Sequence, residues 1–522
     1  MKKMFNKIKF ISLSLLVFLV SSCEKDFLDR PAEDSITLDD YYATDAQVAA
    51  ATNVLYNRTW FQFQERAFFA IAEVGSGNMY SGSSDVSALR NFSMSSTDGE
   101  LGNGWSSLWA VIAQSNSLIN FLEERADPSV NPVILQNAIG EAYFMRATAY
   151  FYLVRLWGPV PIIENNLDYV DSPQINTNRI EDVYELITRD YTEAMNRLVE
   201  KNRGSNYGEN GHVSKGSAEA MLAKAYLYMQ DYPNAKLHAG NVINSGEFKL
   251  LGGDVIPEKS FADLFLLENN NNEESIFALQ WKPNANYGNA NNCNTRFSYA
   301  NTLSNATYSA TFAPSLDIIE AYSSNDLRRR ETFMIPGDEY PTLLTGDGTT
   351  LVVPDDISPQ GIDGAGIKKY VLGKISDIAG IADEWGMMEN NTYIMRYSEL
   401  LLIYAEACMN GGGSTSDPLA LDAYNAVRNR ANLLDDADGV ITFDEIFKER
   451  RLELAFEGDY WYDLGRIPRA EAIAIMTAQN RGNSDNEEHF TPTESDFYMP
   501  YPDVDVVANP LLLEEPVPYT FN

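Results

Sequence analysis

The sequence predicts a mainly α-helical fold, interrupted by one long irregular region that holds a few short strands. Runs of helix length, in which alanine and aromatic residues recur at helical spacing, occupy both halves of the chain. Between them lies a stretch rich in Asn and Gly, which favours turns. The 522 residues, 45% of them apolar, suffice for a large hydrophobic core. We therefore expect one domain over residues 23–522, with a helical scaffold at about 40–246 and 391–470 and a loop-rich insertion at about 247–390.

The first 22 residues are typical of a bacterial secretory signal. Residues 10–20 form an apolar stretch that follows four lysines, Lys2, Lys3, Lys7 and Lys9. As a helix this stretch is about 16 Å long, too short for the ~30 Å hydrocarbon core of a bilayer. It ends in Val20-Ser21-Ser22-Cys23, which resembles a lipobox, so we expect a signal peptide over 1–22 and a lipid anchor on Cys23. The alternative is an ordinary signal peptide with an incidental cysteine.

The composition disfavours several classes of partner. A formal net charge of −35 argues against nucleic acid, because affinity there comes from cations that neutralise phosphates. The three histidines and three cysteines lie far apart without metal-ligand spacing, so we expect no metal site and no cofactor. Residues 434–445 half-resemble a calcium loop, but Leu434 at the first ligand position favours a turn before a helix. A Cys293–Cys408 disulfide is compatible with export, and the sequence does not decide it.

The first two predicted helices flank a polar loop. Residues 40–57 show a small-residue face at helical spacing. A second helix over 105–125 stops before Asp127-Pro128, because the residue before proline avoids the α region. The stretch 74–104 between them is rich in Gly and Ser and predicts a loop.

Three further segments predict closely packed helices. Residues 137–157 place alanines three or four positions from large aromatic residues, which lets neighbouring helices interlock. The same pattern of alanine and aromatic residues recurs at 214–245. It recurs again at 393–410 and 418–430, on either side of Gly411-Gly412-Gly413. These units resemble tetratricopeptide repeats, and their irregular spacing indicates an interrupted array.

Short strands are expected at Ser275–Trp281 and Gly366–Leu372, inside the insertion. Two features disfavour regular helix over most of this region. Residues 269–272 are four consecutive asparagines, and several Gly-Asp turns follow. Short segments punctuated by proline close the chain between 498 and 518.

Several motifs, taken in order, are shared with one family. They are Cys23-Glu24-Lys25-Asp26-Phe27-Leu28-Asp29, Arg146-Ala147 with Leu156-Trp157-Gly158-Pro159-Val160-Pro161, Asp326-Leu327-Arg328-Arg329, the segment from Arg396 to Ala407, the segment from Glu449 to Gly458, and Tyr462-Asp463-Leu464-Gly465-Arg466. In this order behind a lipobox they are specific, and the chain resembles the SusD/RagB outer-membrane lipoproteins of Bacteroidetes over nearly its whole mature length. It departs from the family pattern at Asp459-Tyr460-Trp461 and at Leu513-Glu514-Glu515-Pro516, so the terminal segment could dock differently.

The charged motifs predict structure rather than catalysis. Lone buried charges are costly, so we expect Arg396, Arg450, Arg451, Glu399 and Glu453 to form ion pairs between helices. The alternative is a pair of carboxylates that act as acid and base in a glycoside hydrolase. A helix seam shared with arginines does not suit that role, and we expect no enzyme activity.

The resemblance implies a receptor that is lipid-anchored at the cell outer membrane. In that family, acidic residues such as Glu24 and Asp26 behind the anchor resemble a signal for the exterior face. The implied ligand is an oligosaccharide or polysaccharide, and the implied partner is a SusC-like TonB-dependent transporter that receives it. The alternatives are a RagB-like receptor for peptides or glycopeptides, a helical scaffold of the transporter complex that binds nothing small, and a surface hydrolase.

Candidate ligand contacts follow from the chemistry of sugars, which present apolar C–H faces and hydroxyl groups to aromatic platforms and polar side chains. The resemblance places the binding face on the loop after the first helices and on the insertion. The candidates are therefore Trp60, Glu73, Asn78, Tyr80, Trp281, Tyr287 and Trp385, with Cys293, Arg296 and Tyr299 as weaker ones. Trp109, Trp157 and Trp461 are expected in the core. For any single tryptophan the alternative is core packing, and for the Asn-rich loop it is a solvated connection.

Overall fold

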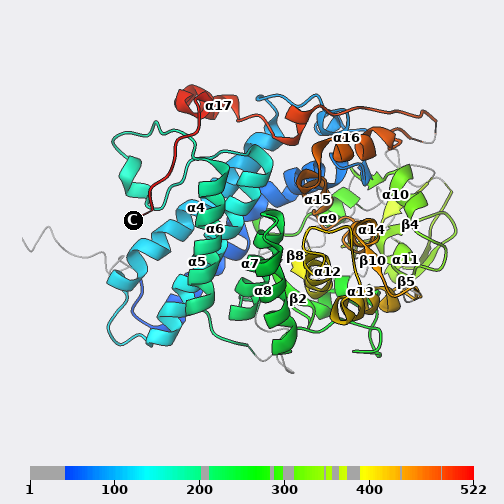
Figure 1. Ribbon diagram of the computed structural model, residues 1–522, viewed down its shortest axis with the longest axis horizontal. Coiled ribbons are helices and arrows are strands. Elements are labelled where there is room, and N and C mark those ends of the chain that lie inside the picture. Colours follow the sequence, from blue (N-terminus) through cyan, green and yellow to red (C-terminus); the bar gives the residue numbers. More distant parts are fainter. Residues whose placement is uncertain are drawn as a thin grey trace, which may run out of the picture.

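The computed structural model describes residues 41–201, 211–282, 287–297, 311–345, 348–355, 364–372, 388–434, 438–483 and 485–521. The predicted signal peptide and Cys23 lie outside these residues. Within them helices predominate and the strands are short, which confirms the predicted mainly α fold. Figure 1 shows the long helices side by side on one side of the molecule and the short elements of the insertion on the other. No helix of the described residues is long and apolar enough to cross a membrane.

Five long helices that pack consecutively form the first part of the scaffold: α4 (Gly99–Arg125), α5 (Pro132–Trp157), α6 (Ile180–Arg197), α7 (Lys215–Tyr228) and α8 (Tyr232–Ser245). The predicted pair at 214–245 is confirmed. Ser214 caps α7 by accepting from the backbone N–H of Ser217, and Gly246 ends α8 in the left-handed region. Helix α4 begins before the predicted position 105, because Asp98 caps it by accepting from two backbone N–H groups.

The stretch before α4 departs from the single helix predicted at 40–57. It contains α2 (Asp45–Ala50), η3 (Asn53–Tyr56), η4 (Arg58–Trp60), η5 (Phe63–Ala67), η6 (Ala70–Val74) and α3 (Ser87–Arg90). Aromatic side chains such as Phe63, Phe68 and Phe69 are buried in all directions around this stretch. Because every face of this stretch is buried, its apolar residues do not form a single stripe. The backbone alternates between tight and wide helical turns.

A second group of helices follows the insertion: α12 (Tyr397–Ala407), α13 (Pro418–Arg430), α14 (Phe443–Glu453), α15 (Tyr460–Arg466) and α16 (Arg469–Ala478). The predicted break after α12 is confirmed, with Gly411 at a φ of +75°. The predicted helical start at 393 is wrong, because Thr392–Arg396 form strand β8. A short apolar run with β-branched and aromatic residues suits a strand as well as a helix, and periodicity alone does not separate the two.

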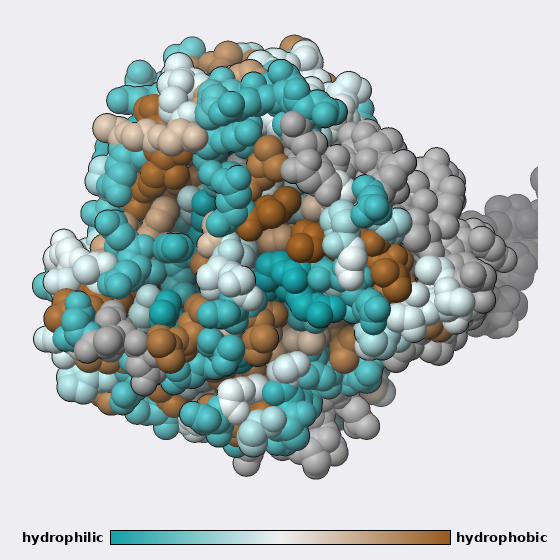
Figure 2. All heavy atoms as spheres, turned by 90° about the vertical axis from the view of Figure 1, so that its right-hand side faces the viewer, coloured by the Kyte–Doolittle hydropathy of each residue, from teal (hydrophilic) through white to brown (hydrophobic). Residues whose placement is uncertain are grey.

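The insertion is closed by a pair of strands, one within it and one directly after it. Strand β2 (Ser275–Leu279) pairs antiparallel with β8, with Ala278 opposite Tyr393. The predicted strand at 275–281 is therefore confirmed, and the one at 366–372 is reduced to two residues of β7. Two short elements of the insertion precede β2, namely η9 (Phe261–Phe265) and η10 (Leu267–Asn269). The elements between β2 and β8 are η11 (Tyr287–Asn289), α9 (Cys293–Phe297), β3 (Ala313–Pro314), α10 (Leu316–Ala321), α11 (Arg328–Thr332), β4 (Phe333–Met334), β5 (Glu339–Leu344), β6 (Thr350–Val352) and β7 (Gly366–Ile367). Figure 2 shows the face on this side of the molecule, where hydrophobic residues lie in small groups among hydrophilic ones.

The remaining short elements connect the helices of the scaffold or follow the last of them. They are η7 (Asn166–Tyr169), β9 (Ser414–Thr415) paired with β10 (Ile441–Thr442), η13 (Glu494–Phe497), α17 (Asp503–Ala508) and η14 (Pro510–Leu513). The terminal segment docks beside α6, where the backbone N–H of Val517 donates to Thr177 O at 2.9 Å and the Tyr519 hydroxyl donates to Glu164 Oε1 at 2.9 Å.

The three tryptophans that were expected in the core lie in it or against it. Trp157 and Trp461 are buried as predicted, and Trp109 is half-buried against the same core. Trp105 is also buried and meets Trp157 edge to face, with ring centroids 5.1 Å apart. Cys293 and Cys408 are both free, so the structure contains no disulfide between them.

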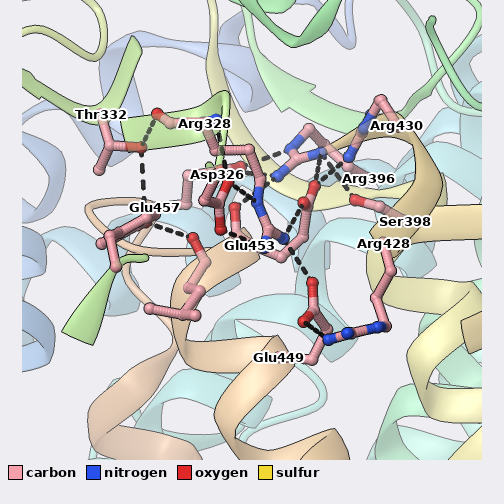
Figure 3. A network of polar contacts seen from close by, with 12 residues as sticks. Asp326, Arg328, Thr332, Arg396, Ser398, Arg428, Arg430, Glu449, Glu453 and Glu457 are labelled. Atoms are coloured by element: carbon pink, nitrogen blue, oxygen red, sulfur yellow. Dashed lines mark hydrogen bonds and ion pairs between the residues drawn. The ribbon is translucent and has the colours of Figure 1, made fainter. Parts of the chain in front are cut away.

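A buried network of ion pairs joins the insertion to the second group of helices (Figure 3). Arg396, at the junction of β8 and α12, donates to Glu457 at 2.7 Å and to Glu453 at 2.9 Å. Arg328 of α11 reaches Glu449 at 2.6 Å and Glu453 at 2.9 Å. Burial alone would raise the pKa of Glu453, but the surrounding guanidinium groups hold it well below its usual value. The network also includes Glu274, Asp326, Lys369 and Arg430.

A second buried cluster joins α7 to α12, α14 and α15. Arg450 donates to Glu399 and to Asp463, each at 3.0 Å. Lys224 binds Glu399 at 2.9 Å and Asp459 at 2.8 Å. Asp459, where the sequence departs from the pattern of the family it resembles, therefore contributes to the cluster. The ion pairs predicted for Arg396, Arg450, Glu399 and Glu453 are thus confirmed. Arg451 also forms one, with Asp317 of α10.

We predict that Arg396→Met lowers the free energy of unfolding by about 3–5 kcal/mol, because it leaves Glu453 and Glu457 buried without their shared partner. Urea unfolding followed by circular dichroism measures this change. Lys215→Met is the control, since it removes an ion pair with Glu200 that lies at the surface, and it should leave the unfolding midpoint nearly unchanged. Equal midpoints for the two variants would show that the network contributes no more than a surface pair.

Candidate ligand-binding site

A short strand presents Tyr80 at the surface beside the insertion. Strand β1 (Met79–Tyr80) pairs antiparallel with β3, which places Tyr80 opposite Ala313. Two hydroxyl groups strengthen the pairing, because Ser315 Oγ donates to Gly77 O at 2.6 Å and Ser81 Oγ donates to Thr311 O at 2.7 Å. Tyr80 itself is half-buried, so part of its ring remains open to solvent.

Buried polar side chains support this strand from below. Glu73 accepts from Asn78 Nδ2 at 2.9 Å and from the backbone N–H of Gly458 at 2.6 Å. Asn78 Oδ1 in turn accepts from Arg451 Nε at 2.8 Å, and Arg451 also pairs with Asp317 of α10. Burial raises the pKa of Glu73 to about 7, although its hydrogen bonds act in the opposite direction. Glu73 and Asn78 therefore position the strand rather than face the solvent.

The exposed edge of the site is an arginine between two aromatic rings. The Arg90 guanidinium lies 5.1 Å from the centroid of the Tyr80 ring and 6.0 Å from that of Phe490. Arg90 also donates from Nη1 to Glu488 Oε2 at 2.5 Å. Arg90, Glu488 and Phe490 are all half-buried. This group, which we call the Tyr80 cluster, combines apolar ring faces with a cation and a carboxylate at the surface.

Arg481 fixes the two loops that carry the cluster. Its guanidinium donates to the carbonyl oxygens of Gly75 at 2.9 Å and Arg90 at 3.2 Å, and to Gln479 Oε1 at 2.8 Å. Burial lowers the pKa of Arg481 to about 9, so the side chain still carries its charge at neutral pH. A buried cation that binds mainly backbone carbonyls ties the loop at 75–90 to the segment after α16.

The two predicted platform tryptophans of the described residues are buried. Trp60 is 0% exposed and donates from Nε1 to Leu55 O at 2.7 Å. Trp281 is 4% exposed and donates from Nε1 to Thr392 Oγ1 at 3.0 Å. Both rings are packed and hydrogen-bonded inside the molecule, so neither presents an open face to a ligand.

The other predicted residues divide into those the structure places and those it does not. Tyr287 is the first residue of η11, but its side chain lies outside the described part of the chain. Trp385 and Tyr299 lie outside it entirely. Cys293 is buried, and Arg296 forms an ion pair with Glu65 at 2.6 Å. Of the seven principal candidates, Tyr80 is the one whose side chain is described as partly open, and Glu73 and Asn78 lie directly behind it.

Sequence reasoning missed Arg90, Arg481, Glu488 and Phe490. Arg90 lies within the loop at 74–104 that was expected to contribute, but Phe490 is 400 positions further along and belongs to no motif. Among the described residues no group of three or more His, Cys, Asp or Glu side chains could hold a metal ion. The stretch that half-resembles a calcium loop leads into α14, where Thr442 and Glu445 form a capping box. This agrees with the favoured prediction of a turn before a helix.

Comparison with known proteins places the chain in a family. The model for the SusD family matches residues 273–517, and the model described as starch-binding associating with outer membrane matches residues 26–227. A SusD-like protein of Bacteroides ovatus is 32% identical, and the match covers 100% of both chains. The chain belongs to the SusD family.

Solved structures with the same fold include one with a bound sugar and one of a SusD-like protein. A crystal structure with xylogluco-oligosaccharide is 29% identical to this SusD-family chain, with a TM-score of 0.78 and coverage of 91% of this chain and 99% of that one. A laminarin binding SusD-like protein, at 22% identity, shares the fold with a TM-score of 0.70 over 90% of this chain and 98% of that one. The motif segments Arg396–Ala407 and Glu449–Gly458, by which the sequence resembles SusD/RagB proteins, contribute to the buried ion-pair clusters, whereas the Tyr80 cluster lies outside these clusters.

We predict that Glu73 makes the stability of this SusD-family protein fall as pH rises from about 5 to 7. Its folded pKa of about 7 lies above the ordinary value of 4.5, so within this window the folded state keeps a proton that the unfolded state releases. The expected loss is about 1.4 kcal/mol for each pH unit at most. Urea unfolding of the wild type and of Glu73→Gln across pH 5–8 measures it. Asp459 also has a raised pKa, so the pH dependence of the wild type alone does not report on Glu73. The difference in unfolding free energy between the wild type and Glu73→Gln does. If that difference stays constant across pH 5–8, the prediction is contradicted.

Proposed function

We propose that the protein is a glycan-binding lipoprotein of the cell surface, which captures an oligosaccharide or polysaccharide and passes it to a SusC-like TonB-dependent outer-membrane transporter. The observation that carries the glycan-binding part is the solved structure with xylogluco-oligosaccharide, whose fold extends over 91% of this chain at 29% identity. The Tyr80 cluster supplies a surface of the chemistry that such a ligand needs.

The Tyr80 cluster suits a neutral sugar. The rings of Tyr80 and Phe490 offer apolar faces for the C–H face of a pyranose. Arg90 can donate to hydroxyl and ring oxygens, and Glu488 can accept from hydroxyl groups, so both hydrogen-bonding roles are present. A neutral glycan carries no charge for the acidic protein to repel. Tyr287 and Trp385 stay candidates for further contacts.

The peptide receptor and the hydrolase are less well supported. A RagB-like receptor would use the same surface, but the oligosaccharide in the related structure favours a glycan. For a hydrolase, the motif carboxylates Glu449, Glu453 and Glu457 are unsuited as acid and base, since each is buried and ion-paired. A scaffold without a small ligand gives no role to the partly open rings of Tyr80 and Phe490.

We predict that Tyr80→Ala and Phe490→Ala each weaken binding of xyloglucan oligosaccharides at least tenfold, about 1.4 kcal/mol, because each removes a stacking face. Isothermal titration of the wild type and both variants measures this, with laminarin oligosaccharides and other neutral glycans in the same panel. Tyr41→Ala is the matched control, since Tyr41 is an exposed tyrosine outside the cluster, and its affinity should equal that of the wild type.

Two results would contradict the proposal. Absence of binding to every glycan by the folded protein, with the transporter present, would favour peptide capture or a scaffold. Release of new reducing ends during the titration would favour the hydrolase.

We also predict that Cys23→Ser moves the protein from the membrane fraction of the cells to the soluble fraction, because the acyl chains on Cys23 supply its anchor. Cell fractionation with detection of the protein measures this. Cys408→Ser is the matched control, since Cys408 is a free thiol within the folded domain, and this variant should stay with the membrane. Retention of Cys23→Ser in the membrane fraction would show that the anchor lies elsewhere.

A further inference from the structure

A cavity of about 550 Å³ lies where four separate parts of the chain meet, and it shares no lining residue with the Tyr80 cluster. Its walls are the turn between α7 and α8, the end of α12 with the glycines that follow, the first residues of α14, and the junction of α15 with α16. We call it the glycine-loop pocket. It is large enough for one or two sugar rings on the scale of small-ligand sites, which span about 300–1,000 Å³.

The consecutive glycines explain why this pocket stays open. Gly411 has a φ of +75°, and a Cβ there would lie 3.1 Å from Cε2 of Tyr232, so a side chain would be strained and would crowd the ring. Gly413 has open space where its side chain would be. The loop is held from behind, because the backbone N–H of Phe443 donates to Gly413 O at 2.9 Å and β9 pairs with β10. One wall is therefore a fixed backbone without side chains.

Two aromatic rings face this backbone wall. Tyr232 at the start of α8 and Phe443 at the start of α14 both line the pocket and are half-buried. The Tyr232 hydroxyl makes no hydrogen bond to the rest of the described chain, and the side chain of Gln230 beside it also has none there. The pocket thus offers apolar ring faces together with unused hydrogen-bonding groups.

The charges of the pocket are acidic or already balanced. Arg466 at the floor donates from Nη2 to Glu406 Oε2 at 2.8 Å and from Nε to Asp463 at 2.8 Å, so its charge is neutralised. Asp444 and Glu471 line the pocket, are exposed, and form no ion pair with the residues the structure describes. These free carboxylates accept hydrogen bonds from hydroxyl groups and repel an anionic ligand.

We propose that the glycine-loop pocket is a second saccharide subsite, which takes a neutral sugar with one ring face on Tyr232 or Phe443 and its hydroxyl groups on Asp444, Glu471 and Gln230. The proposal rests on the proposed function, because it assigns a second contact for the same class of ligand. A long glycan that reaches both sites gains avidity, whereas a monosaccharide does not. A basic peptide is the other ligand that free carboxylates and aromatic rings attract, and its binding is an outcome of the test.

Hydrogen–deuterium exchange with mass spectrometry tests the two sites separately in the same sample. The probes are xyloglucan, cello- and laminarin oligosaccharides at millimolar concentration, and an oligolysine peptide. We expect saccharide to slow exchange in peptides that cover 409–415 and 440–446, in addition to those that cover 78–92. Tyr232→Ala should remove the protection at 409–415 and weaken binding there at least tenfold, and leave the protection at 78–92 unchanged.

Two variants serve as comparisons. Tyr232→Phe keeps the ring and removes only the hydroxyl, so it should retain most of the protection at 409–415. Tyr498→Ala removes an exposed tyrosine that does not line the pocket, and it should behave as the wild type.

The remaining outcomes overturn the proposal in distinguishable ways. Protection only at 78–92 with every saccharide would leave the proposed function intact and exclude the second subsite. Protection at neither region would overturn both. Protection of 409–415 by oligolysine but by no saccharide would assign the pocket to cations instead.

Discussion

The buried charges between the insertion and the helices constrain the rest of the structure. Glu453 contacts Arg328, Arg396 and Arg430 at once, and none of these side chains reaches solvent. An unpaired charge in that position costs several kcal/mol, so the segments that supply the partners must assemble together. Arg328 comes from the insertion, Arg396 from the strand that closes it, and Arg430 from α13. The network therefore selects one arrangement of segments that lie far apart in the sequence.

Helix α14 extends this constraint to the candidate site. Neighbouring residues on a helix point in different directions, and here Arg450 reaches Glu399 and Asp463 while Arg451 reaches Asn78 and Asp317. The first arginine joins helices, and the second supports the strand that carries Tyr80. Asn78, which lies behind the half-buried Tyr80, is thus part of the same buried framework as the family motifs.

The helix pairs could be predicted because their signal is local, as the agreement at 418–430 with α13 shows. Two kinds of feature were not predictable. Residues 392–396 carry a pattern that fits a helix or a strand, and only the partner β2, more than 100 positions earlier, decides between them. Trp60 and Trp281 stand near element ends, and their burial depends on distant neighbours such as Thr392. The Tyr80 cluster joins Arg90 to Phe490, and no local pattern connects residues so far apart.

The two saccharide surfaces that we propose lie toward opposite ends of one rigid element. Residues at the start of α14 line the glycine-loop pocket, and Arg451 near its end supports Asn78 behind Tyr80. Eleven residues of helix rise about 16 Å, and the ion pairs of Glu449, Arg450 and Glu453 fix α14 against its neighbours. Their separation is thus set by the framework rather than by loops. Because avidity requires that a ligand span both sites in the geometry offered, this fixed spacing would discriminate between glycans by chain shape as well as by the sugar that stacks at each end.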